Sequence, residues 1–539
     1  MLSGVTMMQY NKRMEKDEEI SNLIGQRNMR IQKLRKLREL GFNPFPPKSN
    51  KQLTISEFLD NFDSYLNKKC TIAGRLISWR GHGKIAFANV KDSTGSVQIF
   101  CQSSLLFKPS DDTESLNFDQ IKDLVDVGDF VEVTGNAIVT KAGEKSISPQ
   151  KFRLLTKSLR PIPRSYEEIK DKELLYRRRY LDTNINKEKF DRFIRRSKFW
   201  EAHREFFKQN GFLEMNIPVL ESVTGGADAN PFVTHIDALD EQLYLRISQE
   251  LNLKRLIGGG YDKVYEIGPR FRNEGISEEH LPEHIAMEFY WAYADWQDGM
   301  KFIQELFRFV YNKVYGTLKF TIRGFDIDLA NNWEKIDYTS VIKNRYDIDV
   351  FHTNLEEIKA ILKNNKVKAD GDLNVNRGID LLWKLIRKDI GGPVFLVNEP
   401  KFLSPLAKSD PGNPLLTQRF HPIIGGFELG NGFSELNDPE DQLNRFLEQQ
   451  RLRDNGDKEA QMLDIDFVEM LEYGMPPTFG YGHSERNFWV FEGAPAKDCV
   501  PFPLMRHSVS GLTKDIYPDI YKKVETKRQE EKGSRKKHE

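Results

Sequence analysis

The chain has 539 residues and a mass of 62.7 kDa, so at about 150 residues per domain we expect two or three domains. Hydrophobic residues make up 39% of the chain and charged residues 30%, a balance that excludes wholesale disorder. The 80 basic and 80 acidic side chains cancel. The total charge therefore says nothing about a nucleic-acid partner, and only local patches can indicate one.

No apolar run reaches the roughly 20 residues needed to cross a bilayer, and residues 1–19 contain no secretory signal. The three cysteines, Cys70, Cys101 and Cys499, lie far apart and form no CxxC pair. This spacing argues against a disulfide framework or a zinc site. We therefore expect a cytoplasmic protein.

Residues 1–66 are predicted to be a basic helical segment. Isoleucine and leucine recur at helical spacing between Ile20 and Leu37, and Gly41 followed by two prolines ends the helix. The other faces carry six basic residues, a pattern that is most often a solvated surface.

Residues 67–160 have the alternation of short strands. The alternating stretches are 71–77, 85–90, 96–100 and 129–138, with one helical stretch at 119–125. This pattern favours a small closed barrel of the oligonucleotide-binding type, although other small β-barrels fit it nearly as well.

A large α+β domain is predicted over residues 191–513, after a charged linker at 161–190. Amphipathic helices at 193–210 and 300–314 alternate irregularly with strands at 244–247, 264–268, 286–293 and 394–397. Since no regular βαβ repeat is present, we expect a mainly antiparallel sheet flanked by helices. Residues 347–390 are predicted to be a helical insertion, and residues 514–539 a charged tail.

No phosphate-binding glycine loop of the common kinds is present, so a nucleotide would be held in another way. One candidate for holding a nucleotide is the segment 270-RFRNEGISEEHLPEHIAMEFYWAYADW-296. Its Arg272 is a fork-shaped donor suited to phosphate. Taken alone, such a segment is more often a surface hairpin.

Residues 246–296 together resemble the second signature of class II aminoacyl-tRNA synthetases, and within them the lysyl-tRNA synthetase family. The long stretches 224–240, 403–420 and 426–442 resemble the same family, as does 211-GFLEMNIPVL-220, with its proline at Pro218, for the first signature. Residues 73–100 are similar to the family's anticodon-binding barrel. The resemblance extends from about Leu23 to His507 and implies a homodimer.

The resemblance implies a lysine pocket. A lysine ammonium must lose its water and gain acceptors, whereas an aspartate site would need a cation at the side-chain end. The positions implied to bind lysine are Glu250, Glu288, Tyr290, Asn431, Phe433 and Glu435.

The resemblance also implies an ATP site beside that pocket. Arg272 on the α-phosphate and Arg486 towards the γ-phosphate are the implied catalytic residues, and Glu428 is the implied magnesium ligand. The remaining ATP-binding positions are Glu274, His280 and His284. The implied reaction forms lysyl-adenylate and then transfers lysine to the 3′ end of tRNA(Lys).

In the barrel, Phe87 is implied to stack on an anticodon base, with Arg80, Gln98 and Glu144 reading base edges. Without the resemblance, a core aromatic would be the better interpretation of Phe87.

Several positions depart from the family pattern. His421 replaces a glutamate, which leaves the number of magnesium ions open. His284 replaces the phenylalanine that stacks on adenine, and Glu279 replaces a basic residue. The third signature, 478-TFGYGHSER-486, is one residue shorter than the family's, which leaves the register of Arg486 open.

Two alternatives to a lysine enzyme remain at this point. One is a sister synthetase for aspartate or asparagine, which the acidic set Glu250, Glu288 and Glu435 argues against. The other is a tRNA-binding paralogue without catalysis, suggested by the altered third signature, Glu279 and His421.

Overall fold

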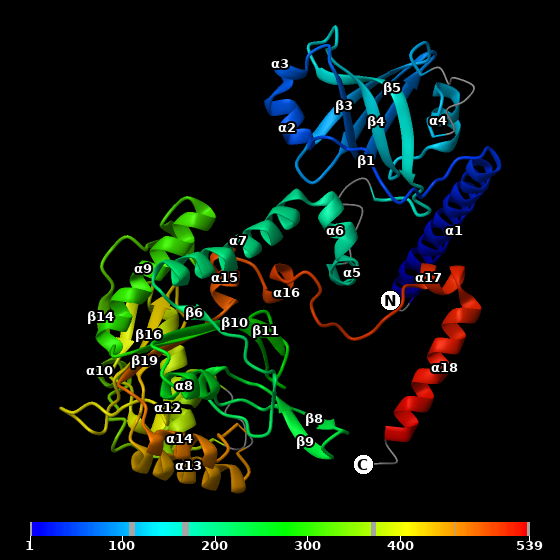
Figure 1. The fold of residues 1–539 in the computed structure, drawn as a ribbon. Helices are drawn as coiled ribbons and strands as arrows, with labels where there is room; N and C mark the ends of the chain where they lie inside the picture. Colours follow the sequence, from blue (N-terminus) through cyan, green and yellow to red (C-terminus); the bar gives the residue numbers. More distant parts are fainter. Residues whose placement is uncertain (1–2, 107–113, 164–171, 368–372, 458, 536–539) are drawn as a thin grey trace. The chain divides into compact units, whose positions relative to one another are not determined.

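The computed structural model describes residues 3–106, 114–163, 172–367, 373–457 and 459–535 (Figure 1). The chain divides into two compact units, unit 1 with residues 1–169 and 506–539, and unit 2 with residues 170–505. The domain limits predicted from the sequence remain predictions. Parts of the predicted linker, insertion and tail fall on residues 164–171, 368–372 and 536–539, outside the described residues.

Unit 1 is built on a closed five-stranded barrel with the strand order β1-β2-β3-β5-β4. Its strands are β1 (Lys69–His82), β2 (Ile85–Lys91), β3 (Ser96–Gln102), β4 (Phe130–Val139) and β5 (Lys145–Thr156). Its helices are α1 (Ser3–Glu39), α2 (Ile55–Asp60), α3 (Phe62–Tyr65), α4 (Phe118–Leu124), α17 (Gly511–Ile516) and α18 (Pro518–Arg535). The predicted small barrel and its single internal helix are confirmed.

Alternation along β2 shows how the sequence forms the barrel. Ala86, Ala88 and Val90 are buried, whereas the residues between them point outward. At the turn after β2, Asp92 Oδ1 accepts hydrogen bonds from the Thr94 backbone N–H at 2.8 Å and from its hydroxyl. The inward set closes the core and the turn fixes the strand register.

Helix α1 packs on the barrel through more than its apolar stripe. Leu34 and Leu37 are buried, and so is Arg30, which donates to the carbonyls of Val127 at 2.9 Å and Ser158 at 3.1 Å. Lys33 forms an ion pair with Asp126 at 2.7 Å. Two of the basic residues of this helix are therefore committed to contacts within unit 1.

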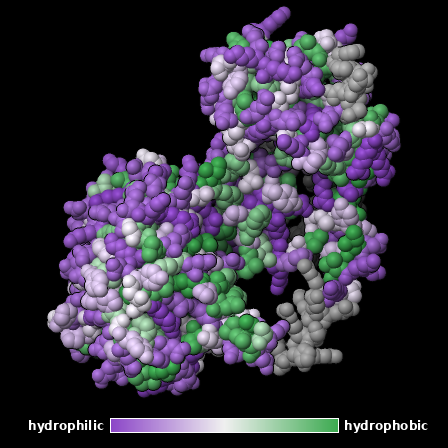
Figure 2. Space-filling model, viewed as in Figure 1, coloured by the Kyte–Doolittle hydropathy of each residue, from purple (hydrophilic) through white to green (hydrophobic). Residues whose placement is uncertain are grey.

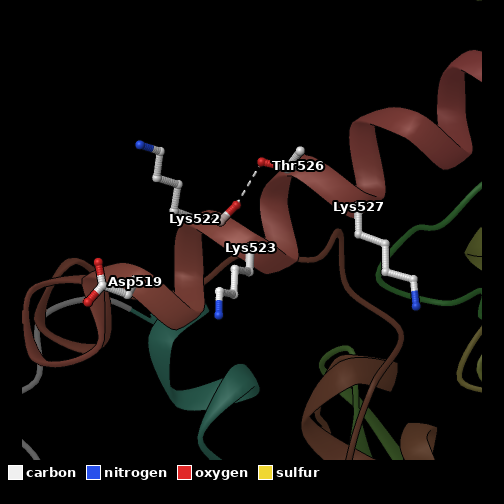
Figure 3. A pocket seen from close by; sticks show the side chains of 5 residues that line it. All are labelled: Asp519, Lys522, Lys523, Thr526 and Lys527. Carbon is white, nitrogen blue, oxygen red and sulfur yellow. Dashed lines mark hydrogen bonds between the residues drawn. The ribbon is translucent and has the colours of Figure 1, made fainter.

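The described part of the C-terminal segment is helical and basic. In α18, Lys522, Lys523 and Lys527 are exposed and point away from the helix axis, and the Thr526 hydroxyl donates to the Lys522 carbonyl at 3.0 Å (Figure 3). Arg27 of α1 donates to Tyr517, beside the start of α18, at 3.3 Å. The segment thus belongs to the same unit as the barrel.

Unit 2 is an α+β unit. Its helices are α5 (Lys172–Arg177), α6 (Arg179–Ile185), α7 (Lys187–Gln209), α8 (Glu250–Gly258), α9 (Trp296–Tyr315), α10 (Tyr338–Tyr346), α11 (Leu355–Asn364), α12 (Val375–Ile386), η2 (Arg387–Asp389), η3 (Lys401–Leu403), α13 (Pro439–Asp454), α14 (Ile465–Tyr473), α15 (Arg486–Phe491) and α16 (Ala496–Cys499). Its strands are β6 (Leu213–Glu214), β7 (Leu220–Glu221), β8 (Phe232–Ile236), β9 (Glu241–Leu245), β10 (Lys263–Phe271), β11 (Glu283–Ala292), β12 (Lys319–Ile322), β13 (Phe325–Asp328), β14 (Glu334–Asp337), β15 (Val394–Val397), β16 (Arg419–Ile424), β17 (Phe427–Glu428), β18 (Asn431–Ser434) and β19 (Thr478–Ser484).

The main sheet has nine strands, in the order β14-β15-β16-β18-β19-β11-β10-β6, with β17 paired to β16. Only the end pairs β14–β15 and β10–β6 are parallel, and the other pairings are antiparallel. The predicted mainly antiparallel sheet is therefore confirmed. Its central strands β11 and β19 are mostly buried.

Helices α7 and α9 pack together over the sheet and bury a large aromatic core. Asp295 caps α9 by accepting from the Gln297 and Asp298 backbone N–H groups at 2.8 and 3.0 Å, and Gly316 ends the helix at a φ of 69°. The apolar stripe that predicts this helix is buried along its length, from Phe302 to Val310.

The surface reflects the high charge content of the chain. Figure 2 shows hydrophilic residues over most of the visible face of each unit, with smaller apolar patches between them. Among the residues that the structure describes, every helix is too short or too polar to cross a membrane.

Candidate active site

The sheet register gathers four of the predicted lysine-binding residues around two glycines of β19. Each glycine lies opposite one residue of β11 and one of β18. The groups are Gly482 with Glu288 and Asn431, and Gly480 with Tyr290 and Phe433. Since alternate residues of a strand share a face, all four side chains lie on one face of the sheet.

The three predicted acidic residues converge at this place. Glu250 at the start of α8 is 6% exposed, Glu288 on β11 is 4% exposed and Glu435 just after β18 is 1% exposed. A Cβ added at Gly480 would collide with the Glu435 carboxylate and the Tyr290 ring. Glycine in the third signature therefore makes room for the acidic cluster.

Each acid is held in a different way. Glu288 accepts from the Ser248 hydroxyl at 2.9 Å and from the Tyr290 hydroxyl at 3.3 Å. Burial raises the pKa of Glu250, and it raises the pKa of Glu435 well above its usual range despite a neighbouring ammonium. Burial and the three carboxylates together raise the pKa of Tyr290, so its hydroxyl stays a donor.

The ammonium belongs to Lys254, a residue that the sequence prediction missed. Its Nζ lies 2.6 Å from Glu250 Oε1 and forms an ion pair with Glu435, and its side chain is fully buried. Burial works to lower the pKa of Lys254, but the two carboxylates outweigh it and the net shift is upward. The i, i+4 spacing from Glu250 was the available signal.

Arg270, also missed, connects the acidic cluster to the predicted ATP site. Its Nη1 donates to Glu288 at 3.2 Å and its Nε donates to His284 Nε2 at 3.0 Å. Burial and the neighbouring Arg270 hold the pKa of His284 well below its usual range, so the ring is neutral. His284 therefore acts here as an acceptor for a buried guanidinium.

The two predicted phosphate-binding arginines each keep an unused donor. Among the described residues, the Nε atoms of Arg272 and Arg486 are buried and have no hydrogen-bond partner. Glu485, before Arg486, is 1% exposed, pairs with Arg196 at 2.7 Å and accepts from the Ile285 backbone N–H at 3.1 Å. Glu485 is thereby held between the end of β19 and Arg486, the first residue of α15.

The loop from Arg272 to Pro282 carries the other predicted ATP residues. Glu274 and His280 are exposed, and His280 Nδ1 contacts the Ser277 hydroxyl at 2.8 Å. Partial burial and the charge of Arg486 lower the pKa of His280. Glu279 of the same loop forms an ion pair with Arg486.

The predicted magnesium ligand, Glu428, is surrounded by charged groups. It accepts from the Trp383 indole N–H, and His421 and Arg387 lower its pKa although burial opposes them. His421 is itself directed at Glu399, 3.1 Å away. No group of three or more candidate metal ligands occurs in the described residues. An ionised Glu428 fits magnesium held jointly with phosphate oxygens.

The predicted anticodon-reading residues lie on the barrel. Phe87 is 37% exposed and stacks on Phe100 with the ring centres 4.9 Å apart, which excludes the core interpretation. Arg80 is its register partner on β1. Gln98 on β3 accepts from the Ser146 hydroxyl at 2.9 Å, and Glu144 is exposed just before β5.

Comparisons with known proteins agree with this architecture. Residues 171–506 match the family model described as tRNA synthetases class II (D, K and N), and residues 70–155 match an OB-fold nucleic acid binding domain. The chain is 44% identical over 489 residues to a lysine–tRNA ligase of Fervidobacterium nodosum, covering 89% of this chain and 94% of the relative. It is 42% identical over 492 residues to that of Thermotoga maritima (89% and 96%), and 39% identical over 494 residues to that of Carboxydothermus hydrogenoformans (91% and 99%).

Proposed function

This chain belongs to the lysine–tRNA ligase family of class II tRNA synthetases, and we propose that the site around Gly480 and Gly482 activates lysine with ATP and passes it to tRNA(Lys). The observation that carries the assignment is the buried convergence of Glu250, Glu288 and Glu435 beside Arg270 and Arg272. The names of the relatives favour lysine over aspartate or asparagine, and favour an enzyme over an inactive paralogue.

The lysine pocket follows from this chemistry. Glu435 and Glu250 would accept from the substrate ammonium, and Phe433 would line its aliphatic stem. Glu288 and Tyr290 would orient the amino-acid end, and Asn431, held by Arg419 at 2.7 Å, would complete that polar wall. A neutral or acidic side chain would leave buried carboxylates unpaired, which is a strong basis for rejecting it.

Arg272 and Arg486 would bind the triphosphate, since each has a buried Nε without a partner among the described residues. The lysine carboxylate then attacks the α-phosphorus as the bond to the β-phosphate oxygen breaks, giving lysyl-adenylate and diphosphate. The protein supplies positioning and positive charge at the phosphorus. A hydroxyl of the terminal tRNA adenosine attacks the carbonyl carbon in turn, and AMP leaves.

Three further residues are assigned to ATP with smaller roles. Glu274 would accept from the adenine amino group, and His280 would act as a donor near the phosphates. His284, neutral and bonded to Arg270, would lie against the adenine in place of a phenylalanine.

Glu428 is the residue that would hold magnesium. The ion would neutralise phosphate charge in the triphosphate. His421 stands where a second carboxylate is usual in the family, and its partner is Glu399. We therefore propose that Glu428 binds magnesium without a second carboxylate at the position of His421.

On the barrel, Phe87 would stack on an anticodon base while Arg80, Gln98 and Glu144 read base edges. The exposed ring supports this role, because stacking needs an accessible aromatic face. A homodimer joined through the first signature around Pro218 and a cytoplasmic location also remain predictions. Sedimentation equilibrium of the full chain tests the first.

Diphosphate exchange into ATP, run with lysine, aspartate and asparagine in turn, tests the proposed function. Exchange with lysine alone is the expected result. Exchange with aspartate would contradict the acidic pocket, and exchange with none of the three would favour the non-catalytic alternative.

A further inference from the structure

Lys254 lies within the proposed lysine pocket but has no part in the reaction described above. Its ammonium is fully buried, and both carboxylates that contact it, Glu250 and Glu435, are the ones proposed to hold the substrate. Burying a charge costs several kcal/mol unless it is well paired. Here Glu250 and Glu435 offset this cost by pairing with Lys254, and the same two carboxylates must later accept from the substrate ammonium.

The position of this ammonium is tightly defined. Lys254 lies one helical turn after Glu250 in α8, which brings the two side chains onto one face. Its Nζ also lies 5.5 Å from the centre of the Phe433 ring and 5.7 Å from that of Phe467. Lys254 therefore connects α8 to Glu435, the residue after β18.

The other charged groups that face the pocket have partners of their own. Glu288 is bonded by Ser248, Tyr290 and Arg270. Arg419 on β16 pairs with Glu399 at 3.0 Å. Lys254 is thus the cation shared by Glu250 and Glu435, and Glu435 Oε1 is buried without a hydrogen-bond partner among the described residues.

We propose that Lys254 is a positioning and specificity residue for lysine. It holds Glu250 and Glu435 at a fixed separation, and its positive charge opposes the burial that favours their neutral forms, so that both carboxyls can accept from an alkylammonium. The unpaired Glu435 Oε1 is the acceptor reserved for that group. This inference rests on the proposed function, because it concerns the same pocket.

The consequence of losing Lys254 follows from elementary electrostatics. Two buried carboxylates without a cation between them repel, so one takes up a proton and stops accepting from the substrate. Raising the pH removes that proton. Lysine binding in such a variant should therefore improve with pH relative to the wild-type protein, an effect that a purely structural ion pair would not produce.

The test is the Michaelis constant for lysine in diphosphate exchange, measured with Lys254→Met and Lys254→Gln, the second of which keeps a hydrogen-bond donor should the first fail to fold. At pH 7 the KM for lysine should rise about tenfold or more, with kcat at saturation and the KM for ATP changed little. The increase should shrink towards pH 9, relative to wild type at each pH. Arg255→Met is the matched control, since Arg255 pairs with Asp464 instead, and its KM for lysine should stay unchanged.

A double-variant cycle separates this proposal from the assignment of the pocket. If Lys254 acts through Glu435, adding its substitution to Glu435→Gln should raise the KM for lysine much less than adding it to wild type. Full additivity, or an unchanged KM in the single variants, would overturn the role of Lys254. A lower KM would overturn it too, because Lys254 would then be competing with the substrate. An unchanged KM in Glu435→Gln alone would instead refute the pocket itself.

Discussion

Arg486, the first residue of α15, forms an ion pair with Glu279 of the loop between β10 and β11. The guanidinium is thereby engaged by a carboxylate at the place where the proposed reaction needs it to bind phosphate. The acid is 46% exposed and its loop is the one that carries Glu274 and His280. In the proposed reaction, an ATP phosphate would therefore compete with Glu279 for Arg486.

Removing that charge should tighten ATP binding. Exposed ion pairs are worth up to about 1 kcal/mol, so Glu279→Gln should lower the KM for ATP by roughly two- to fivefold. Diphosphate exchange at saturating lysine measures it, with Glu278→Gln in the same loop as the matched control. An unchanged or higher KM for ATP would mean that Arg486 does not meet the triphosphate.

Phe87 should matter for tRNA and not for lysine activation. Loss of one stacking platform should weaken tRNA(Lys) binding by about 1–3 kcal/mol in Phe87→Ala. Filter binding gives the affinity and diphosphate exchange the activation rate. Phe130→Ala is a matched control in the same barrel, because Phe130 is also 37% exposed but lies against Arg75. A large fall in exchange for Phe87→Ala would show that the ring supports the barrel instead.

The elements that the sequence predicts well are those set by local periodicity. The barrel strands and the buried stripe of α9 follow from alternation and from helical spacing, which depend only on neighbouring residues. The order of strands around Gly480 and Gly482 is a tertiary property, and no single segment encodes it. The family resemblance implies which residues bind lysine, whereas the strand order is defined only by the sheet register.

What the sequence could not show is how distant charges pair. Lys254 is buried between Glu250 of its own helix and Glu435 just after β18. Arg30 belongs to a basic run of the kind that, taken alone, is most often a solvated surface, and it instead donates to carbonyls of the barrel unit. The placement of Arg30 depends on residues far away in the chain, and so does the contact of Lys254 with Glu435, whereas Glu250 is only four residues from Lys254.

Substitutions in the acidic pocket should impair the use of lysine much more than the binding of tRNA(Lys). Glu435→Gln and Glu250→Gln each remove a charged acceptor, which is worth about 1.5–3 kcal/mol, so the KM for lysine should rise roughly 10- to 150-fold. Binding of tRNA(Lys), measured on the same preparations, should stay nearly unchanged. Equal losses in lysine use and tRNA binding would contradict the assigned roles.

Because the carboxyl of Glu221, at the end of β7, is largely buried, we expect the stability of unit 2 to depend on pH. Burial raises the pKa of this carboxyl to about 8, one oxygen accepts from Asn252 at 3.1 Å, and the other is buried without a partner among the described residues. The unfolded chain releases this proton near its ordinary pKa of about 4.5, whereas the folded protein retains it. The free energy of unfolding should therefore fall as the pH rises from about 4.5 to 8, and stay reduced above that.

Glu221→Gln should remove this loss, because the amide keeps an acceptor for Asn252 and carries no charge to bury. The variant and the wild type should melt at similar temperatures at pH 4. At pH 8.5 to 9 the variant should be more stable by about 1–2 kcal/mol, or roughly 2–6 °C in Tm, a figure already discounted for partial access of water. Thermal melts followed by circular dichroism across this range measure the difference. Parallel curves at all pH values would mean that the carboxyl ionises normally in the folded protein and that water reaches its second oxygen.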